Sequence, residues 1–291
     1  MSLHSGFVFA INELPIENGV GDGLYQQSIF ILLPVGNSAP FMIYELKIAL
    51  KTIREEGFGS LFRKILQYIG QWFQAIWFVA IRKPKGDSPE QVVDFSFHAA
   101  GGLIYPGQIR SEFVRLATLV QQRKPQVVVE IGTANGGTLF AWCALAQPRA
   151  VIVSIDLPGG IHGGGYAYWR SFIYRRFTQP GQSLHLFRAD SHLPGTREAL
   201  QKVLPPQGID FLFIDGDHTY EGIKADFEMY SPLVRPGGLV ALHDICVHPP
   251  EMNCHVDKLW REIQQKYKTS EIIEKANQGG FGIGVVFFNS E

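Results

Sequence analysis

Charged residues are scarce in this chain, and neither sign dominates. They make up 18% of the 291 residues, against about 25% in an average soluble domain. The 26 basic and 27 acidic side chains leave a formal net charge of −1, so the broad basic field that holds nucleic acid is absent and we expect no nucleic-acid partner. Hydrophobic residues reach 46%, which excludes disorder of the whole chain. The length predicts one large domain or two small ones.

Cysteine is rarer still. Cys143, Cys246 and Cys254 form no CxxC pair and are too few for a disulfide scaffold, which favours a reducing compartment. Residues 1–41 lack the basic start and the small-residue cleavage site of a secretory signal. We therefore expect a cytoplasmic protein, with association to a membrane left open by the next feature.

One long stretch has no charge at all. Residues 65–81 carry none, while basic pairs at 63–64 and 82–83 flank them, and seventeen residues is the lower limit for crossing a bilayer core. Three glutamines recur in it at helical spacing: Gln67, Gln71 and Gln74. Such a polar stripe is typical of a helix that lies in a membrane interface. We predict peripheral membrane contact through residues 61–83; burial against the main domain or in a dimer, and a true span, are the alternatives.

Three regions differ in composition. Residues 1–41 are Gly-rich and weakly patterned, so we expect a poorly ordered upstream extension, with Met42 as the natural start. Residues 42–90 predict an amphipathic helical segment that ends in a linker rich in Pro, Gly and Lys. In residues 91–291 strand and helix patterns alternate, which predicts one α/β domain.

Six strands are expected in this last region: 127–130, 151–156, 183–188, 209–215, 239–243 and 281–288. Helices are expected between them at 138–146, 168–177, 196–203, 220–229 and 256–267. This alternation predicts a doubly wound, mostly parallel sheet with helices on both faces. Ligands of such sheets bind beyond the carboxyl ends of the strands, so the residues after each strand are the candidates for a site.

The first three strand ends carry glycines and carboxylates. The turn EIGTANGG at residues 130–137 has GxxxGG spacing, whereas a dinucleotide site needs GxGxxG. Its first residue, Glu130, suits a cationic ligand better than a pyrophosphate. Asp156 ends the second strand, where a carboxylate can accept both ribose hydroxyls of a nucleoside. Asp190 and Ser191 follow the third strand and fit either an adenine edge or a simple turn.

Four longer motifs resemble the class I S-adenosylmethionine-dependent methyltransferases, and among them the macrocin-type and cephalosporin-hydroxylase-like O-methyltransferases. They are VVVEIGTANGGT, VSIDLPGG, IDFLFIDGDHTYEGIKADF and LVRPGGLVALHDI, and the resemblance covers about residues 99–288. It implies a Rossmann-like sheet whose last strand is antiparallel. It also implies that S-adenosylmethionine is held by residues of the first three strand ends: Glu130, Gly132, Thr133 and Gly136 for the methionine part, Asp156 for the ribose, Asp190 and Ser191 for the adenine.

The fourth and fifth strands end in Asp215-Gly-Asp217-His218 and His243-Asp244. These strands are neighbours in a doubly wound sheet, and so many acids and imidazoles together are costly unless they bind a cation or exchange protons. By the resemblance, Asp215 and Asp244 would ligate a divalent cation, Mg²⁺ or Mn²⁺, and Asp217 would be the catalytic base. The macrocin-type pattern has two acids where this chain has His243-Asp244, and an imidazole there favours Mn²⁺ or iron over Mg²⁺. His218 or His243 as the base without a metal is an alternative, as is mere capping of the next helix by Asp217 and His218.

Three further segments carry open alternatives. The five-glycine loop at 159–166 fits a lid or a flexible linker. The loop at 243–255 has zinc-ligand residue types in no usual zinc spacing, so we expect a loop that faces the substrate. Gln108 and Glu112 fit a helix that covers the cofactor or a solvated helix face.

These features together predict an S-adenosylmethionine-dependent O-methyltransferase. The resemblance implies as acceptor a hydroxyl of a saccharide, a glycolipid or a small metabolite. One alternative is an NAD-linked oxidoreductase, which the glycine spacing opposes. Another is a membrane-recruited binding protein with a degenerate methyltransferase domain, which the intact acids oppose. A homo-oligomer is also open.

Overall fold

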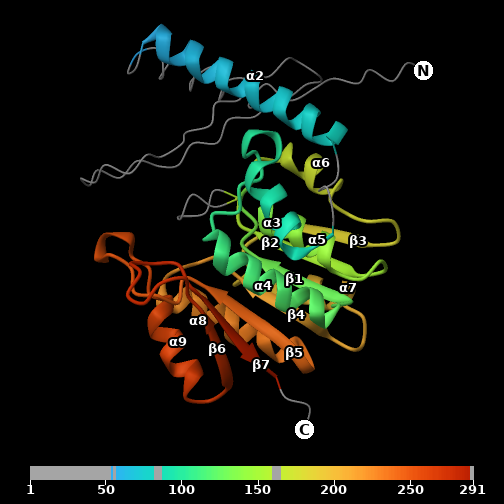
Figure 1. Ribbon diagram of the computed structural model, residues 1–291, viewed down its shortest axis with the longest axis vertical. Coiled ribbons are helices and arrows are strands. Elements are labelled where there is room, and N and C mark those ends of the chain that lie inside the picture. The colour runs from blue at the N-terminus through green and yellow to red at the C-terminus, as the bar shows by residue number, and fades with distance from the viewer. Residues whose placement is uncertain (1–53, 55–56, 82–86, 159–164, 289–291) are drawn as a thin grey trace.

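The computed structural model describes residue 54 and residues 57–81, 87–158 and 165–288 (Figure 1). The expectations for residues 1–41, the start at Met42 and the lid at 159–164 lie outside this described part. So does most of the predicted linker, at 82–86.

A seven-stranded sheet forms the centre of the described chain, in the order β3-β2-β1-β4-β5-β7-β6. Neighbours among the first five strands pair in parallel, and β7 pairs antiparallel with both β5 and β6. This confirms the mostly parallel sheet with one antiparallel late strand. The strands are β1 (Val127–Ile131), β2 (Val151–Asp156), β3 (Ser183–Arg188), β4 (Ile209–Ile214), β5 (Val234–His243), β6 (Lys268–Ile272) and β7 (Ile283–Phe287).

The two central strands are buried along their whole length. Every residue of β1 and β4 is buried, as expected for parallel strands that helices cover on both faces. The chain leaves β1 toward β2 on one side and returns to β4 on the other, so the strand order reverses between β1 and β4. Open α/β sheets bind ligands at such a reversal, beyond the carboxyl ends of the strands.

Helices cover the two faces of the sheet separately, each over its own apolar core. The first face carries α3 (Pro89–His98), α4 (Arg110–Arg123), α5 (Gly137–Leu145) and α6 (Arg170–Tyr174). The second carries α7 (Pro194–Val203), α8 (Tyr220–Tyr230) and α9 (Val256–Gln264). Short 3₁₀ turns are η1 (Ala99–Gly101), η2 (Ser231–Leu233) and η3 (Pro250–Met252). The arrangement is a doubly wound, Rossmann-like fold, as predicted.

A long helix, α2 (Phe58–Ile81), precedes the sheet domain and forms the predicted N-terminal helical segment (Figure 1). It lies against η1, and Ala75 on this side is buried in the core of the first face. Within the described part of the chain, no helix combines the length and the hydrophobicity needed to cross a bilayer.

Candidate functional site

Buried polar side chains gather at the carboxyl ends of the central strands. Six of them are at most 7% exposed: Glu130, Thr133, Asp156, Thr138, His243 and Asp244. Buried polar groups are costly unless they are paired, so this edge of the sheet differs in kind from the apolar core behind it. It is the same edge at which the strand order reverses.

The turn between β1 and α5 needs its glycines because neighbouring atoms leave no room for a side chain. Gly132 has a φ of +87°, and a Cβ on it would lie 1.9 Å from the carbonyl oxygen of Asp215. A Cβ on Gly136 would lie 2.6 Å from the ring of Tyr174, whose hydroxyl donates to the carbonyl of Ala134 at 2.7 Å. The turn is therefore packed directly against the end of β4.

Asp156, the predicted ribose ligand, fastens this turn to β2. Its Oδ2 accepts the backbone N–H groups of Thr133 at 3.1 Å and Ala134 at 2.8 Å. Burial raises the pKa of Asp156 to about 6, although these backbone donors and Arg188 act against the rise. One carboxylate thus already organises the turn beside which a ribose would lie.

Glu130 lies at the end of β1, under the turn, and is completely buried. Its Oε1 accepts the indole N–H of Trp142 at 2.9 Å, while its Oε2 has no hydrogen-bond partner among the described residues. Burial raises the pKa of Glu130 to about 8, against hydrogen bonds from Thr138, Thr133 and Trp142. The group is therefore an acid that holds its proton near neutral pH, with one acceptor oxygen unused.

Asp190 and Ser191 follow β3 and form a turn. Asp190 Oδ1 accepts the backbone N–H of His192 at 2.8 Å, and its carbonyl accepts the hydroxyl of Thr196. The carbonyl of Ser191 accepts the hydroxyl of Tyr230 at 2.6 Å. Asp190 and Ser191 thus form the turn that the sequence offered as one alternative, and contact of both residues with adenine stays a prediction.

Asp215, His218, His243 and Asp244 converge in what we call the acid–histidine cluster. His243 Nδ1 lies 3.1 Å from Asp215 Oδ1 and 3.3 Å from Asp244 Oδ2. His218 Nε2 lies 3.3 Å and 3.4 Å from the same two oxygens. Parallel pairing of β4 with β5 brings these side chains together, as predicted.

Charge pairing within the cluster outweighs burial. Burial lowers the pKa of His243, but the Asp215 and Asp244 carboxylates raise it to about 10. The pKa of His218 is likewise raised, because Asp215 and Asp244 outweigh its desolvation. Burial raises the pKa of both carboxyl groups, yet the imidazoles bring both below the usual range. At neutral pH the cluster thus pairs the Asp215 and Asp244 carboxylates with a protonated His243 imidazole.

The Asp217 carboxylate contacts the start of α8 rather than the acid–histidine cluster. Its Oδ1 accepts the backbone N–H of Thr219 at 2.8 Å, and a Cβ on Gly222 would lie 2.1 Å from its Cγ. Thr219 is the residue whose side chain caps α8. The carboxylate of Asp217 therefore lies at the start of α8, as the capping alternative supposes, whereas His218 lies in the cluster.

Two residues that hold the cluster were not among the predicted catalytic and metal residues. Gln108, just before α4, donates from Nε2 to Asp215 Oδ2 at 2.8 Å, and His248 Nε2 lies 3.1 Å from Asp244 Oδ1. The solvated-face alternative for Gln108 and Glu112 is wrong, because they are 3% and 0% exposed. The sequence did contain a signal for His248, because this histidine lies four residues after Asp244 in a loop rich in residue types that bind metals.

The donor atoms fit a metal ion. Two groups of described residues offer ligand atoms within 4.8 Å of one another and share Asp244: Asp215, His218 and Asp244, and Asp244, His248 and Cys254. Asp244 has a φ of +64°, a backbone conformation that is rare outside glycine and that recurs at functional sites. Mixed oxygen and nitrogen donors suit Mn²⁺, Fe²⁺ or Zn²⁺ better than Mg²⁺.

Residues 129–245 match the family model of a methyltransferase domain. Among curated proteins, the chain is 31% identical over 149 residues to an uncharacterised protein of Sinorhizobium fredii, covering 50% of this chain and 16% of that protein. It is 31% identical over 142 residues to an uncharacterised protein of Acanthamoeba polyphaga mimivirus, covering 47% of this chain and 60% of that one. The chain thus spans less than two thirds of either relative.

Solved structures with a similar fold include two O-methyltransferases. One, from Bacillus cereus in complex with SAH, has a TM-score of 0.47 and 18% identity, over 70% of this chain and 92% of that one. The other, TomG from Streptomyces achromogenes in complex with SAM, has a TM-score of 0.45 and 14% identity, over 71% and 92%.

Proposed function

We propose that the chain is a class I S-adenosylmethionine-dependent O-methyltransferase that prepares its acceptor hydroxyl at the acid–histidine cluster, a proposal that the match of residues 129–245 to a methyltransferase domain supports. The observation that carries the proposal is the contact between Gly132 and Asp215. The turn, where the methionine part of the cofactor would lie, is thus directly beside the backbone of Asp215, the first acid of the cluster. When the cofactor site and the site of the methyl acceptor are adjacent, the methyl group and the acceptor hydroxyl can be held in line for transfer.

The cofactor would lie along the carboxyl ends of β1, β2 and β3. When bound, S-adenosylmethionine supplies an electrophilic methyl group on a sulfonium ion. In this reading the methionine part contacts Glu130, whose Oε2 has no hydrogen-bond partner among the described residues, and Asp156 accepts ribose hydroxyls while keeping its backbone donors. Asp190 and Ser191 form the wall at the adenine end.

Asp215, His218 and Asp244 are the residues that would hold a divalent cation, with Mn²⁺ favoured by the imidazole. A bound divalent cation lowers the pKa of a coordinated oxygen, which is what an unreactive alcohol needs. Gln108 and His243 fix the Asp215 carboxylate in place from two sides. The motif resemblance makes Asp217 the base that takes the proton of the acceptor, whereas its carboxylate contacts the start of α8 and the alternative bases, His218 and His243, lie in the cluster. A cluster that works through its histidines alone is the metal-free version of the same proposal.

A saccharide, a glycolipid or a small metabolite is the acceptor class that we propose, on the strength of the motif resemblance. The NAD-linked oxidoreductase is the weaker candidate, because the GxxxGG turn is closed by packing at Gly132 and Gly136. A degenerate binding protein is also weaker, because the cluster is intact.

Calorimetric titration tests the cofactor, and a methyl-transfer screen tests the reaction. We expect S-adenosylhomocysteine to bind at micromolar concentration and NADH not to bind. Transfer to a panel of saccharide and glycolipid acceptors should fall on addition of a chelator and return with Mn²⁺. Binding of NADH in place of S-adenosylhomocysteine would overturn the proposal, and activity that a chelator leaves unchanged would favour the metal-free version.

Replacing Asp217 by Asn tests the base separately. Asparagine keeps an oxygen that accepts the N–H of Thr219, so the start of α8 should be preserved. We expect turnover to fall at least about a hundredfold, with the affinity for S-adenosylhomocysteine unchanged. Turnover equal to that of the wild type would remove Asp217 from the mechanism and leave His218 or His243.

A further inference from the structure

The helix α2 has one face turned toward the sheet domain. On this face Gln74 touches η1, where a Cβ on Gly101 would lie 2.8 Å from its amide nitrogen. Ala75 beside it is 5% exposed. Gln74 and Ala75 thus face the sheet domain.

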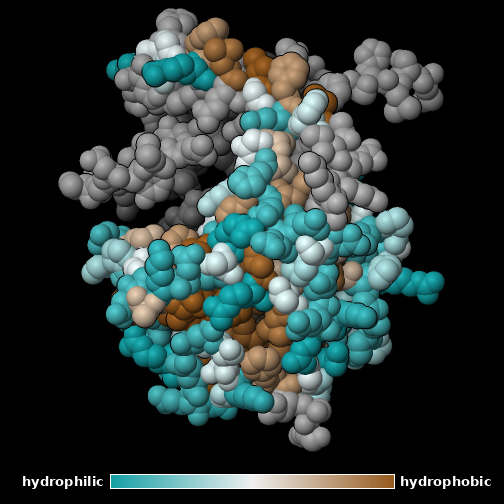
Figure 2. All heavy atoms as spheres, viewed as in Figure 1, coloured by the Kyte–Doolittle hydropathy of each residue, from teal (hydrophilic) through white to brown (hydrophobic). Residues whose placement is uncertain are grey.

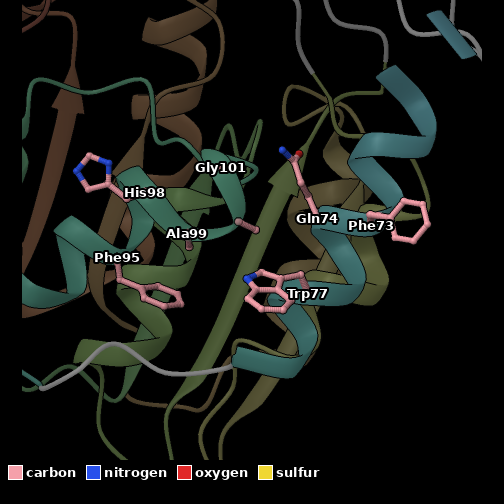
Figure 3. A pocket seen from close by; sticks show the side chains of 8 residues that line it. Phe73, Gln74, Trp77, Phe95, His98, Ala99 and Gly101 are labelled. Carbon is pink, nitrogen blue, oxygen red and sulfur yellow. The ribbon is translucent and has the colours of Figure 1, made fainter. Parts of the chain in front are cut away.

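The opposite face is apolar and open to solvent, and its row of exposed side chains extends to Trp77, which points toward α3 (Figure 3). Six large side chains recur there at intervals of three or four residues, and Figure 2 shows hydrophobic residues along this helix at the molecular surface. We call them the α2 stripe: Phe62, Leu66, Ile69, Phe73, Ile76 and Trp77. They are between 44% and 69% exposed. Contiguous apolar surface of this kind marks an interaction site, because scattered single residues do not line up on one helix face.

Charge around the stripe is of one sign. Residues 57–86 contain five basic residues and no acidic one, and the basic residues lie at the two ends: Arg63, Lys64, Arg82, Lys83 and Lys85. Of the formal net charge of −1, the rest of the chain therefore contributes −6. An apolar stripe with cationic ends complements an anionic lipid surface.

We propose that α2 lies in the plane of an anionic bilayer, with the α2 stripe in the acyl boundary and the Gln74 side toward the sheet domain. A second copy of the chain is a poorer occupant. Two such helices packed stripe to stripe and antiparallel bring the basic ends of one against those of the other, and the segment has no acid to compensate them. A bilayer that contains phosphatidylglycerol supplies the missing negative charge.

An apolar recess adjoins the stripe. Phe73 and Trp77 also line a cavity of about 690 Å³, whose other wall is formed by Phe95, His98 and η1 (Figure 3). Most of its lining is apolar, as in pockets that take hydrophobic ligands. The proposed orientation places this cavity at the level of the lipid interface, between α2 and α3.

Vesicle flotation with the full chain tests the proposal. We expect the wild type to float with vesicles of 70% phosphatidylcholine and 30% phosphatidylglycerol, and at least tenfold less with pure phosphatidylcholine. The triple variant Phe62→Gln, Ile69→Gln, Ile76→Gln should lose at least tenfold of the bound fraction. Met252→Gln, which removes a 56% exposed apolar side chain in η3, is the matched control and should float like the wild type.

Three results would overturn the proposal. They are a wild type that stays unbound with both kinds of vesicle, a triple variant that floats like the wild type, and a dimer in light scattering that the triple variant turns into a monomer. Circular dichroism and the melting temperature show whether the variant is folded. Because the substituted side chains are exposed, we expect both to match the wild type. The outcome does not depend on methyl transfer, so failure here and failure of the proposed enzyme activity are distinguishable.

Discussion

Glu130 is a single residue that should make stability depend on pH. Its pKa is raised to about 8 by burial, so the folded state holds the proton more tightly than the unfolded chain. Its contribution to stability is therefore complete below about pH 4.5 and is lost as pH rises toward about 8, by at most about 1.4 kcal/mol per pH unit. Glu130→Gln keeps an acceptor for Trp142 but has no proton to lose.

Urea unfolding at pH 5, 6, 7 and 8 measures this effect. We expect the difference in unfolding free energy between Glu130→Gln and the wild type to shift in favour of the variant as pH rises. Glu90→Gln, on the exposed side of α3, is the control and should leave the difference flat. Parallel profiles for wild type and Glu130→Gln would show that the carboxyl group is ionised in the folded state throughout.

For single residues, the sequence predicted which side chains lie at the site better than it predicted the direction in which each side chain points. Asp215, His218, His243 and Asp244 meet because they end adjacent parallel strands, which the strand pattern alone implies. The direction of Asp217 toward α8 depends on a local hydrogen bond with Thr219, which strand order does not specify. Glycine spacing was read as room for a ligand, yet Gly132 is required first by the carbonyl of Asp215.

Among the elements, α4 is tied to the C-terminal loop by one buried carboxylate. Glu112 accepts the backbone N–H groups of Glu274 at 2.9 Å and Gly282 at 3.0 Å, and the side-chain amide of Gln278 at 2.7 Å. The same loop places Phe281 beside the ring of His243. Helix α4 therefore helps to position the loop that lies beside the acid–histidine cluster, although the helix and the loop are far apart in the sequence.

Glu112→Ala should loosen this loop, because the buried backbone N–H of Gly282 loses its acceptor and that of Glu274 keeps only Gln278 Oε1. We expect a loss of unfolding free energy of about 3 kcal/mol, given about 1–3 kcal/mol for each buried donor left unpaired. Hydrogen exchange should quicken at the amides of Glu274 and Gly282. Glu198→Ala, on the exposed face of α7, serves as the control. Unchanged exchange at both amides would contradict the role assigned to Glu112.

The sequence pattern missed the elements whose composition differs from that of a typical buried strand or helix. The central strands are runs of Val, Ile and Phe and were placed within a few residues, but β6 is an edge strand with mostly polar, exposed residues. At α3, Pro89 was read as the end of a linker, whereas it is the first residue of a helix that Ser88 caps. The contacts of Gln108 and His248 come from loops, whose paths depend on the finished packing.

For the whole molecule, the uneven division of charge should orient the chain on a membrane. The five basic residues at 63–85 attract anionic lipid, while the remaining chain, at a formal −6, is repelled by it. Attraction between exposed charges is screened by salt, since the Debye length falls from about 8 Å at 0.15 M to about 3 Å at 1 M. The apolar stripe is not screened in this way.

Binding to phosphatidylglycerol vesicles should therefore weaken with salt without disappearing. Between about 0.1 M and 1 M NaCl we expect the partition coefficient to fall about a thousandfold, because the five basic residues lose most of their contribution of about 1 kcal/mol each. The triple stripe variant should lose a larger share of its residual binding at high salt, because it keeps only Leu66, Phe73 and Trp77 of the stripe and depends more on charge attraction. Flotation across a salt series measures both curves. A wild type released entirely at 1 M would mean that the stripe does not enter the lipid, and a wild type insensitive to salt would mean that the basic ends do not contact it.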